Sequence, residues 1–202
     1  MLSSNKITAN SLTPEVLLSA YRAGYFPMGN PDTGGIEWHE PVWRAIIPLD
    51  AVKISRSLRQ TLKKGHFEFR FDTDFEFTIA ACSKRDDTWI TGVIIESYCT
   101  LHRAGYAHSV ETWCNGEMVG GLYGVAIGGA FFGESMFSTM SDASKAAFTA
   151  LINRMNERNM KLLDSQYINP FTESLGAVEI PRSEYLNRLE AALQSNTSFA
   201  GE

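Results

Sequence analysis

Two short segments place carboxylate and amide side chains where they could form a site. Glu134 lies in GESMFS (133–138), at the end of an expected strand and before a helix. A carboxylate beside backbone amides fits a functional site, and a turn with a solvated glutamate is the alternative. Asp164 and Gln166 lie two positions apart in KLLDSQY (161–167), so as strand residues they should share one face with Leu162. Such polar groups need partners when buried, which indicates either a hydrogen-bonded structural pair or a site.

Two further segments could bind a nucleic acid. Trp89, in Thr88-Trp89-Ile90, precedes an expected helix that carries Tyr98. Exposed aromatic side chains can stack on bases, although packing in the core is the commoner role. Residues 53–70 contain six Lys or Arg and one Glu, whereas the whole chain has a formal charge of −5. Four of the cations share one helix face, which could be a solvated face or a phosphate-binding patch: Arg56, Arg59, Lys63 and Lys64.

Several other chemistries have no sequence support. The chain contains no G-x-x-x-x-G-K-[ST], G-x-S-x-G, H-E-x-x-H or EF-hand pattern. Its four histidines have no metal-ligand spacing, so no metal is expected. The three cysteines (82, 99 and 114) have no C-x-x-C spacing and are expected as free, buried thiols.

The N-terminus MLSSNKITANSL lacks the features of a signal peptide, and the longest apolar stretch, 118–133, is too short and glycine-rich to span a membrane. We therefore expect a soluble cytoplasmic protein.

The hydrophobic pattern predicts a mixture of helices and strands. An antiparallel meander is expected over 108–113, 117–127 and the strand from 130, with turns at Asn115-Gly116 and Gly128-Gly129. The glycines of its middle strand suggest a bulge or a close approach of another backbone. The segment 26–41 is interpreted as an irregular loop, either in a small N-terminal lobe or in the wall of a cleft. The fold class is α/β, of the mixed α+β kind. Helices are expected over 14–24, 55–65, from 74, over 91–105, 141–159, before 176 and over 183–194, with further strands over 67–71, 161–167 and 177–180.

A series of motifs resembles one enzyme family, the leucyl/phenylalanyl-tRNA–protein transferases. The resemblance runs from about residue 12 to 190. It implies a small N-terminal domain (1–45) followed by a domain like the GNAT N-acetyltransferases (46–202). The motifs are YRAGYFPM (21–28), TWI (88–90), HSVETW (108–113), VGGLYGV (119–125), GESMFS (133–138), ASK (143–145), LLDSQ (162–166) and SLGAVEIPR (174–182).

The resemblance implies an aminoacyltransferase without a cofactor or metal. Leucine, phenylalanine and, less well, methionine would pass from aminoacyl-tRNA to the α-amine of proteins that begin with Arg or Lys. The product would enter N-degron proteolysis. The donor is an ester and the product an amide, so ATP is not needed. The family also implies a monomer that acts away from membranes.

The resemblance also assigns roles to individual residues. Asp164 and Gln166 match the catalytic pair, and Glu134 matches the site glutamate, whose charge we expect to hold the acceptor's cationic residue. Trp89 matches the residue that stacks on the terminal adenine of tRNA, and Met28 replaces a second tryptophan. The basic helix would meet the acceptor-arm phosphates. The other expected substrate-binding residues are Tyr98, Ser135, Leu122, Phe131, Met136, Phe148, Leu151, Met155 and Leu163.

Two other functions compete with this interpretation. An acyl-CoA-dependent N-acyltransferase of the GNAT type usually carries R/Q-x-x-G-x-G/A at a helix start. The nearest string here, 102–107, begins with histidine and lies at an expected helix end. A non-catalytic module that binds tRNA or protein N-termini would not need Asp164, Gln166 and Glu134, which are all present.

Overall fold

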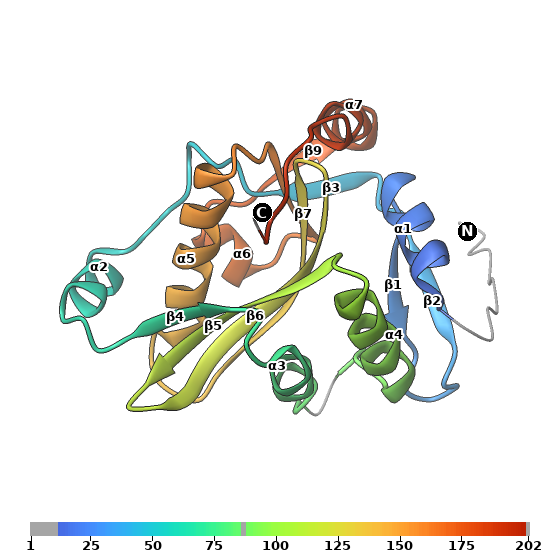
Figure 1. Ribbon diagram of the computed structural model, residues 1–202. Coiled ribbons are helices and arrows are strands. Elements are labelled where there is room, and N and C mark those ends of the chain that lie inside the picture. The colour runs from blue at the N-terminus through green and yellow to red at the C-terminus, as the bar shows by residue number, and fades with distance from the viewer. Residues whose placement is uncertain (1–11, 86–87, 201–202) are drawn as a thin grey trace.

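A central seven-stranded sheet organises the chain. The computed structural model describes residues 12–85 and 88–200. The N-terminal segment 1–12, for which no signal peptide is expected, therefore lies almost entirely outside the described residues. The strand order is β4-β5-β6-β7-β8-β3-β9, and every neighbouring pair is antiparallel except β7 and β8 (Figure 1). Its strands are β3 (Trp43–Ile46), β4 (Glu68–Phe71), β5 (Ala107–Cys114), β6 (Glu117–Ile127), β7 (Ala130–Ser138), β8 (Leu162–Gln166) and β9 (Val178–Pro181).

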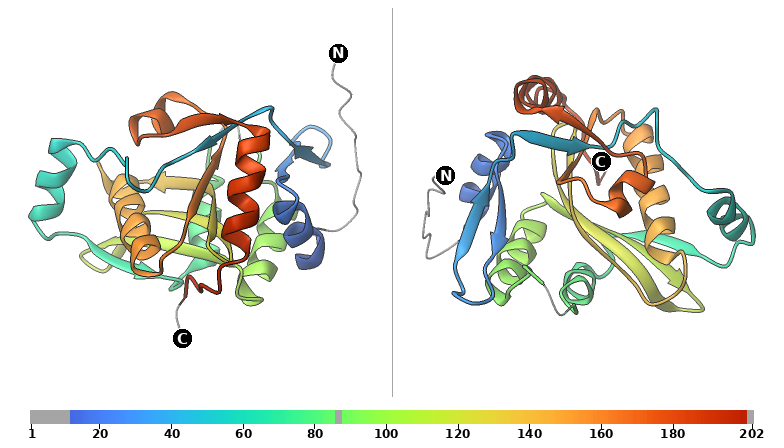
Figure 2. Two further views of the ribbon diagram at one scale, coloured as in Figure 1. Left: turned by 90° about the horizontal axis from the view of Figure 1, so that it is seen from above. Right: turned by 180° about the vertical axis from the view of Figure 1, so that it is seen from behind.

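Helices cover both faces of this sheet. On one face, α1, α3, α4 and α7 pack on a core that includes Ile79, Tyr98 and Phe132. On the other face, α5 packs on a second core with Phe148 and Leu151 (Figures 1 and 2). The mixed α/β class and the helices expected from capping and periodicity are confirmed: α1 (Pro14–Arg22), α2 (Arg56–Lys63), α3 (Phe75–Cys82), α4 (Gly92–Arg103), α5 (Ala143–Glu157), α6 (Pro170–Ser174) and α7 (Arg182–Leu193).

The prediction of an irregular loop over 26–41 is wrong. β1 (Phe26–Gly29) and β2 (Ile36–His39) form a separate two-stranded antiparallel sheet. Asn30 organises the connection, since its side chain accepts hydrogen bonds from the backbone N–H groups of Asp32 and Thr33 and donates to Glu37. The Pro, Gly and Asn content that suggested a loop therefore belongs to a hairpin with short arms.

β3 is a strand that the hydrophobic pattern did not predict. It pairs with β8 on one side and β9 on the other, so it lies inside the large sheet. It also crosses the expected boundary between residues 45 and 46. Cys82 and Cys99 are buried free thiols, as expected, but Cys114 is only half-buried because it ends β5 beside the Asn115-Gly116 turn.

The meander contains the bulge that its glycines suggested. Tyr123 and Gly124 of β6 lie opposite Ser135 and Gly133 of β7, so Glu134 is an extra residue on β7. An extra residue of this kind interrupts the regular alternation of side chains between the two faces of the sheet, so its side chain can point in a new direction. β7 and β8 pair only from Ala130↔Leu162 to Phe132↔Asp164. The bulge and the point where these two strands part therefore lie side by side.

Candidate active site

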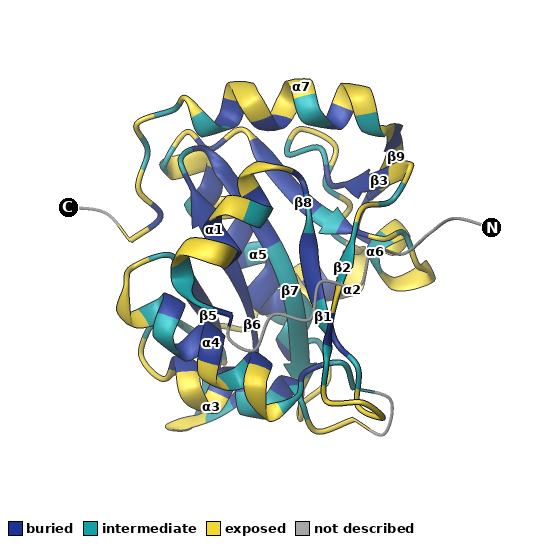
Figure 3. Cartoon of the chain, turned by 90° about the vertical axis from the view of Figure 1, so that its right-hand side faces the viewer, coloured by how far each residue is buried: buried dark blue, intermediate teal, exposed yellow. Residues whose placement is uncertain are grey.

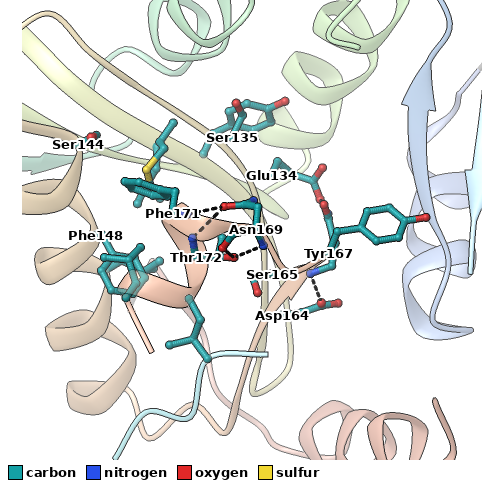
Figure 4. Close-up of a pocket in the computed structure, with 18 of the residues that line it drawn as sticks. Glu134, Ser135, Ser144, Phe148, Asp164, Ser165, Tyr167, Asn169, Phe171 and Thr172 are labelled. Carbon is teal, nitrogen blue, oxygen red and sulfur yellow. Dashed lines mark hydrogen bonds between the residues drawn. The ribbon is translucent and has the colours of Figure 1, made fainter. Parts of the chain in front are cut away.

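A pocket of about 630 Å³ opens where β7 and β8 part (Figure 4). This volume suits a small ligand or one end of a large one. α5 and α6 supply much of its apolar wall, and β1 and the segment before α4 supply another side. Eleven of the expected site residues line it: Met28, Trp89, Leu122, Glu134, Ser135, Met136, Phe148, Leu151, Leu163, Asp164 and Gln166.

The remaining expected residues lie elsewhere. Tyr98, Phe131 and Met155 are fully buried and are not among the residues that line the pocket. Phe131 instead packs against the ring of Phe199, with the centroids 5.1 Å apart. The four cations of the basic helix are exposed on α2 and at its C-cap, Lys64, and α2 lies beyond α5 from the centre of the sheet (Figure 1): Arg56, Arg59, Lys63 and Lys64.

The bulge brings the Glu134 carboxylate into a network of hydroxyl and amide groups. Tyr21 donates its hydroxyl to Oε1 of Glu134 at 2.6 Å, and Nε2 of Gln166 donates to the same oxygen at 2.9 Å. Tyr98 hydrogen-bonds to the Tyr21 hydroxyl, so it reaches the carboxylate through another side chain. Burial raises the pKa of Glu134 to about 8, although the Tyr21 hydrogen bond partly opposes the shift.

Glu134 also has unused hydrogen-bonding capacity. Its Oε2 is buried and has no hydrogen-bond partner among the described residues. The same is true of the hydroxyl of Tyr123, a residue that also lines the pocket. Buried polar atoms without partners are uncommon and costly in folded proteins. A substrate that forms hydrogen bonds with these two groups would relieve that cost.

Asp164 is buried and fully engaged with a cation. Arg44 donates to its carboxylate through Nε at 2.9 Å and through Nη2 at 2.7 Å. The Tyr185 hydroxyl donates at 2.7 Å, and the backbone N–H of Gln166 donates at 2.8 Å. The guanidinium of Arg44 lies over the rings of Phe26 and Tyr185 and donates to the carbonyl of Gly24. Asp164 therefore connects β8 to the N-terminal elements and α7.

Gln166 does not follow the alternation expected of a strand residue. Its φ is +65°, in the left-handed region. The Asp164 carboxylate engages Arg44, whereas the Gln166 amide engages Glu134, so the two side chains have different partners. The expectation that they share one face with Leu162 overlooked this turn of the backbone. Since Gln166 donates to Glu134 through Nε2, its amide oxygen is not used in that hydrogen bond and remains an acceptor.

Trp89 and Met28 lie close together because the backbone of β1 approaches the segment before α4. The N–H of Gly29 donates to the carbonyl of Trp89 at 3.0 Å. A Cβ at position 29 would lie only 2.5 Å from that carbonyl oxygen, so glycine is required. Both Trp89 and Met28 are half-buried and line the pocket. The hairpin thus forms part of the wall of the cleft, one of the two interpretations left open for 26–41.

Sequence reasoning missed several residues of this site. Tyr21 occurred only within a motif, and Arg44 and Tyr185 were not singled out. The available signal for Arg44 was a cation between Trp43 and the apolar run 45–47, which would need a buried partner. The other missed pocket residues are Ile47, Arg85, Tyr123, Gly133, Phe137, Ser138, Ser144, Ser165, Tyr167, Asn169, Phe171, Thr172 and Leu175.

Three other features would have indicated a different kind of site: a metal-binding group, a membrane-spanning helix and an acyl-CoA-binding motif at a helix start. Among residues 12–85 and 88–200, no three His, Cys, Asp or Glu side chains form a group that could hold a metal ion. No helix in that same part of the chain is long and apolar enough to cross a membrane. The string 102–107 spans the end of α4 and the start of β5, as expected, and not the start of a helix.

Comparisons with known proteins match the chain almost from end to end. Residues 46–190 match the model of the family described as leucyl/phenylalanyl-tRNA protein transferase, and residues 10–42 match the N-terminal domain of that family. A leucyl/phenylalanyl-tRNA–protein transferase of Chlorobaculum parvum is 49% identical, covering 92% of this chain and 97% of the relative. That of Gloeobacter violaceus is 50% identical, covering 94% and 98%.

These matches show that the chain is an enzyme of the aminoacyltransferase class. The chain belongs to the leucyl/phenylalanyl-tRNA–protein transferase family, whose substrates are aminoacyl-tRNA and protein. The structure of L-PGS from Bacillus licheniformis is 14% identical over 84% of this chain and 66% of that chain. Its TM-score of 0.48 is too low to assign a fold.

Proposed function

We propose that this enzyme transfers leucine, phenylalanine and, less well, methionine from aminoacyl-tRNA to the α-amine of proteins that begin with Arg or Lys. The products would enter N-degron proteolysis in the cytoplasm. The observation that carries this proposal is an apolar pocket directly beside the Glu134–Gln166 pair. The proposal includes a GNAT-like domain (46–202) after a small N-terminal domain (1–45), acting as a monomer.

The proposed chemistry needs positioning more than strong base catalysis. An α-amine has a pKa of about 7.7–8.0, so an appreciable fraction is neutral near pH 7. Its nitrogen attacks the ester carbonyl carbon, an amide bond forms, and the bond to the ribose oxygen breaks. The amine proton ends on that leaving oxygen. The amide oxygen of Gln166 would accept a hydrogen bond from the attacking amine, and Asp164 would act as a positioning residue that holds the Gln166 backbone.

The donor side chain would occupy the apolar part of the pocket. Leu122, Met136 and Phe148 lie there, together with Leu151 and Leu163. An apolar pocket discriminates by size and shape, at about 1–3 kcal/mol for each methylene group. Such a pocket accepts Leu, Phe and Met side chains and disfavours β-branched ones. The terminal adenine would stack on Trp89, with Met28 beside it.

The test of this proposal uses labelled Phe-tRNA and a short peptide that begins with Arg. We expect transfer to this peptide and none to the same peptide with an acetylated N-terminus. Acetyl-CoA in place of Phe-tRNA tests the competing N-acyltransferase. Transfer from the thioester but not from the tRNA would overturn the proposal. Binding of tRNA without any transfer would favour the non-catalytic module.

Glu134→Gln should weaken capture of the acceptor more than that of the donor. At pH 8.5, above the raised pKa of about 8, the wild-type carboxylate is charged, and we expect the variant to raise the KM for the Arg-peptide about tenfold, as for loss of a hydrogen bond to a charged group. At pH 6.5 the wild-type carboxyl holds its proton, so the difference should shrink. Steady-state kinetics at both pH values test this, and an equal rise in the two substrates' KM values would contradict it.

The same variant has a stability readout. The folded Glu134 carboxyl binds its proton more tightly than the ordinary value of 4.5. The folded state therefore holds the extra proton between about pH 4.5 and 8, and the wild type loses stability as the pH rises through that range. Glu134→Gln should not share this loss, which denaturant titrations at pH 5 and pH 8 would show.

The basic face of α2 should make donor binding sensitive to salt. Lys63→Gln removes one exposed cation and leaves the buried Leu58 contact unchanged. If Lys63 contacts a phosphate, the slope of log K for Phe-tRNA against log salt should fall by about 0.7–0.9. Arg188→Gln, an exposed cation on α7, is the matched control and should leave the slope unchanged. Parallel slopes for all three proteins would exclude this role of Lys63.

A further inference from the structure

The second half of β7 is a strand with only one neighbour. β6 pairs with it as far as Gly120↔Ser138. β8 pairs with it only as far as Phe132↔Asp164. Among the residues that the structure describes, 133–138 therefore have a partner strand on one side and none on the other. Gln166, with its left-handed backbone, ends β8 at this point, and the chain then leads away into α6.

The free side of β7 carries backbone groups without partners. In a paired strand, alternate residues direct their N–H and C=O groups away from the neighbour. Outside the strand ladders, no backbone or side-chain hydrogen bond among the described residues reaches the main chain of residues 133–137. A bare edge of this kind is usually paired, covered or blocked in a folded protein.

This edge is neither covered nor fully open to solvent. Residues 133–138 all line the pocket, and residues 133–137 are half-buried, as the teal part of β7 shows (Figure 3). α5 and α6 face the edge across the pocket (Figure 4). Tyr167, which follows β8, makes no backbone hydrogen bond to β7 among those of the described residues, and its hydroxyl bonds to Nδ1 of His39. The pocket is thus a slot beside a strand edge, and it begins at Glu134 and Gln166.

We propose that the first residues of the acceptor polypeptide pair with β7 over residues 134–138 as an added strand. This inference rests on the proposed function and names how its protein substrate is held. An extended polypeptide presents N–H and C=O groups at the same repeat as the bare edge, which a nucleotide does not. The α-amine lies at Gln166, and the peptide continues in the direction of β8, parallel to β7. At about 3.3 Å for each residue, the edge accommodates about four to five acceptor residues.

Main-chain pairing has a signature that side-chain recognition lacks. Only every second acceptor residue directs its N–H toward β7, so a methyl group on alternate amide nitrogens should block pairing. The probe is a six-residue Arg-Ala-Ala-Ala-Ala-Ala amide, with one N-methyl group at position 3, 4, 5 or 6. Labelled Phe-tRNA is the donor, and the enzyme is unaltered, so no variant can fail to fold.

We expect N-methylation at either position 3 or position 4 to raise the peptide KM at least tenfold. Where the edge extends far enough, N-methylation two residues after that position should have the same effect. The peptides methylated at the intervening positions should stay within about threefold of the unmodified one, and kcat should change little in any of them. They serve as matched controls, because each carries the same added methyl group.

Peptide length gives a second readout. With unmodified peptides of two to six residues, kcat/KM should rise to about four or five residues and then level off. Equal KM values for all the methylated peptides, or a kcat/KM that is already maximal for the dipeptide, would overturn the added strand. The proposed transfer reaction would still stand if the unmodified peptide is a substrate. Failure of that peptide to accept phenylalanine would instead overturn the proposed function.

Discussion

Replacing Arg44 with methionine is expected to lower the free energy of unfolding by about 3–5 kcal/mol, because the variant leaves a buried carboxylate without its cation. Asp164 is 0% exposed and receives three hydrogen bonds from Arg44, two from Nε and one from Nη2. The same carboxylate holds the backbone N–H of Gln166. Transfer should therefore fall about 100-fold or more, since a shift of 1 Å at a reacting group costs that much. Denaturant titration and kcat/KM measure the two effects.

An exposed ion pair and a double variant sharpen this test. Arg188→Met breaks the surface pair with Glu184 and should cost less than about 1 kcal/mol. Arg44→Met combined with Asp164→Leu replaces the buried pair by apolar groups and should recover much of the lost stability. Activity should stay low in the double variant, because the backbone N–H of Gln166 then has no carboxylate to accept its hydrogen bond. Wild-type stability of the single Arg44→Met variant would contradict this account of the pair.

Replacing Gly124 with alanine should also abolish most of the activity. A Cβ at this position would lie 2.3 Å from the carbonyl oxygen of Phe132 and 2.5 Å from the ring of Phe131. Both contacts are too short, so β6 and β7 must separate where the bulge forms. We expect a destabilisation of about 1–3 kcal/mol. Displacement of Glu134 from Tyr21 and Gln166 should lower kcat/KM by about 100-fold.

Gly133→Ala is the matched stability control for this variant. It adds the same methyl group on the opposite strand of the bulge, where the Cβ would meet only the carbonyl oxygen of Asp164, at 3.5 Å. That is an ordinary contact distance, so the melting temperature should stay close to that of the wild type. Equal melting temperatures for Gly124→Ala and Gly133→Ala would show that the bulge tolerates a side chain at position 124.

Local signals predicted most of the elements. Thr13, Ser55 and Asp74 cap α1, α2 and α3 with their side chains, and Asn115-Gly116 closes the β5–β6 hairpin with both residues at positive φ. These features depend on residues a few positions apart. By contrast, β3 is four residues long, and its place between β8 and β9 depends on residues more than 100 positions away.

For the site, too, local features could be predicted from the sequence, whereas contacts between distant residues could not. Asp164 and Gln166 were recognisable as polar residues in an apolar strand, and Glu134 as a carboxylate at a strand end, but their partners were not. Arg44 and Asp164 are 120 positions apart, and no local pattern joins them. The direction of the Glu134 side chain depends on a register shift between β6 and β7, and the partners of Gln166 depend on one left-handed backbone angle. Such geometry is decided by packing rather than by periodicity.

The hydroxyl that α7 contributes to Asp164 makes the surroundings of this carboxylate depend on segments far apart in the chain. Tyr185 donates to a carboxylate that Arg44, near the other end of the chain, also holds. Tyr21 donates to the neighbouring carboxylate of Glu134. A chain that ends before α7 would still carry every residue of the pocket, but its buried aspartate would lack one donor. The set of donors around Asp164 is therefore complete only in a chain that includes α7.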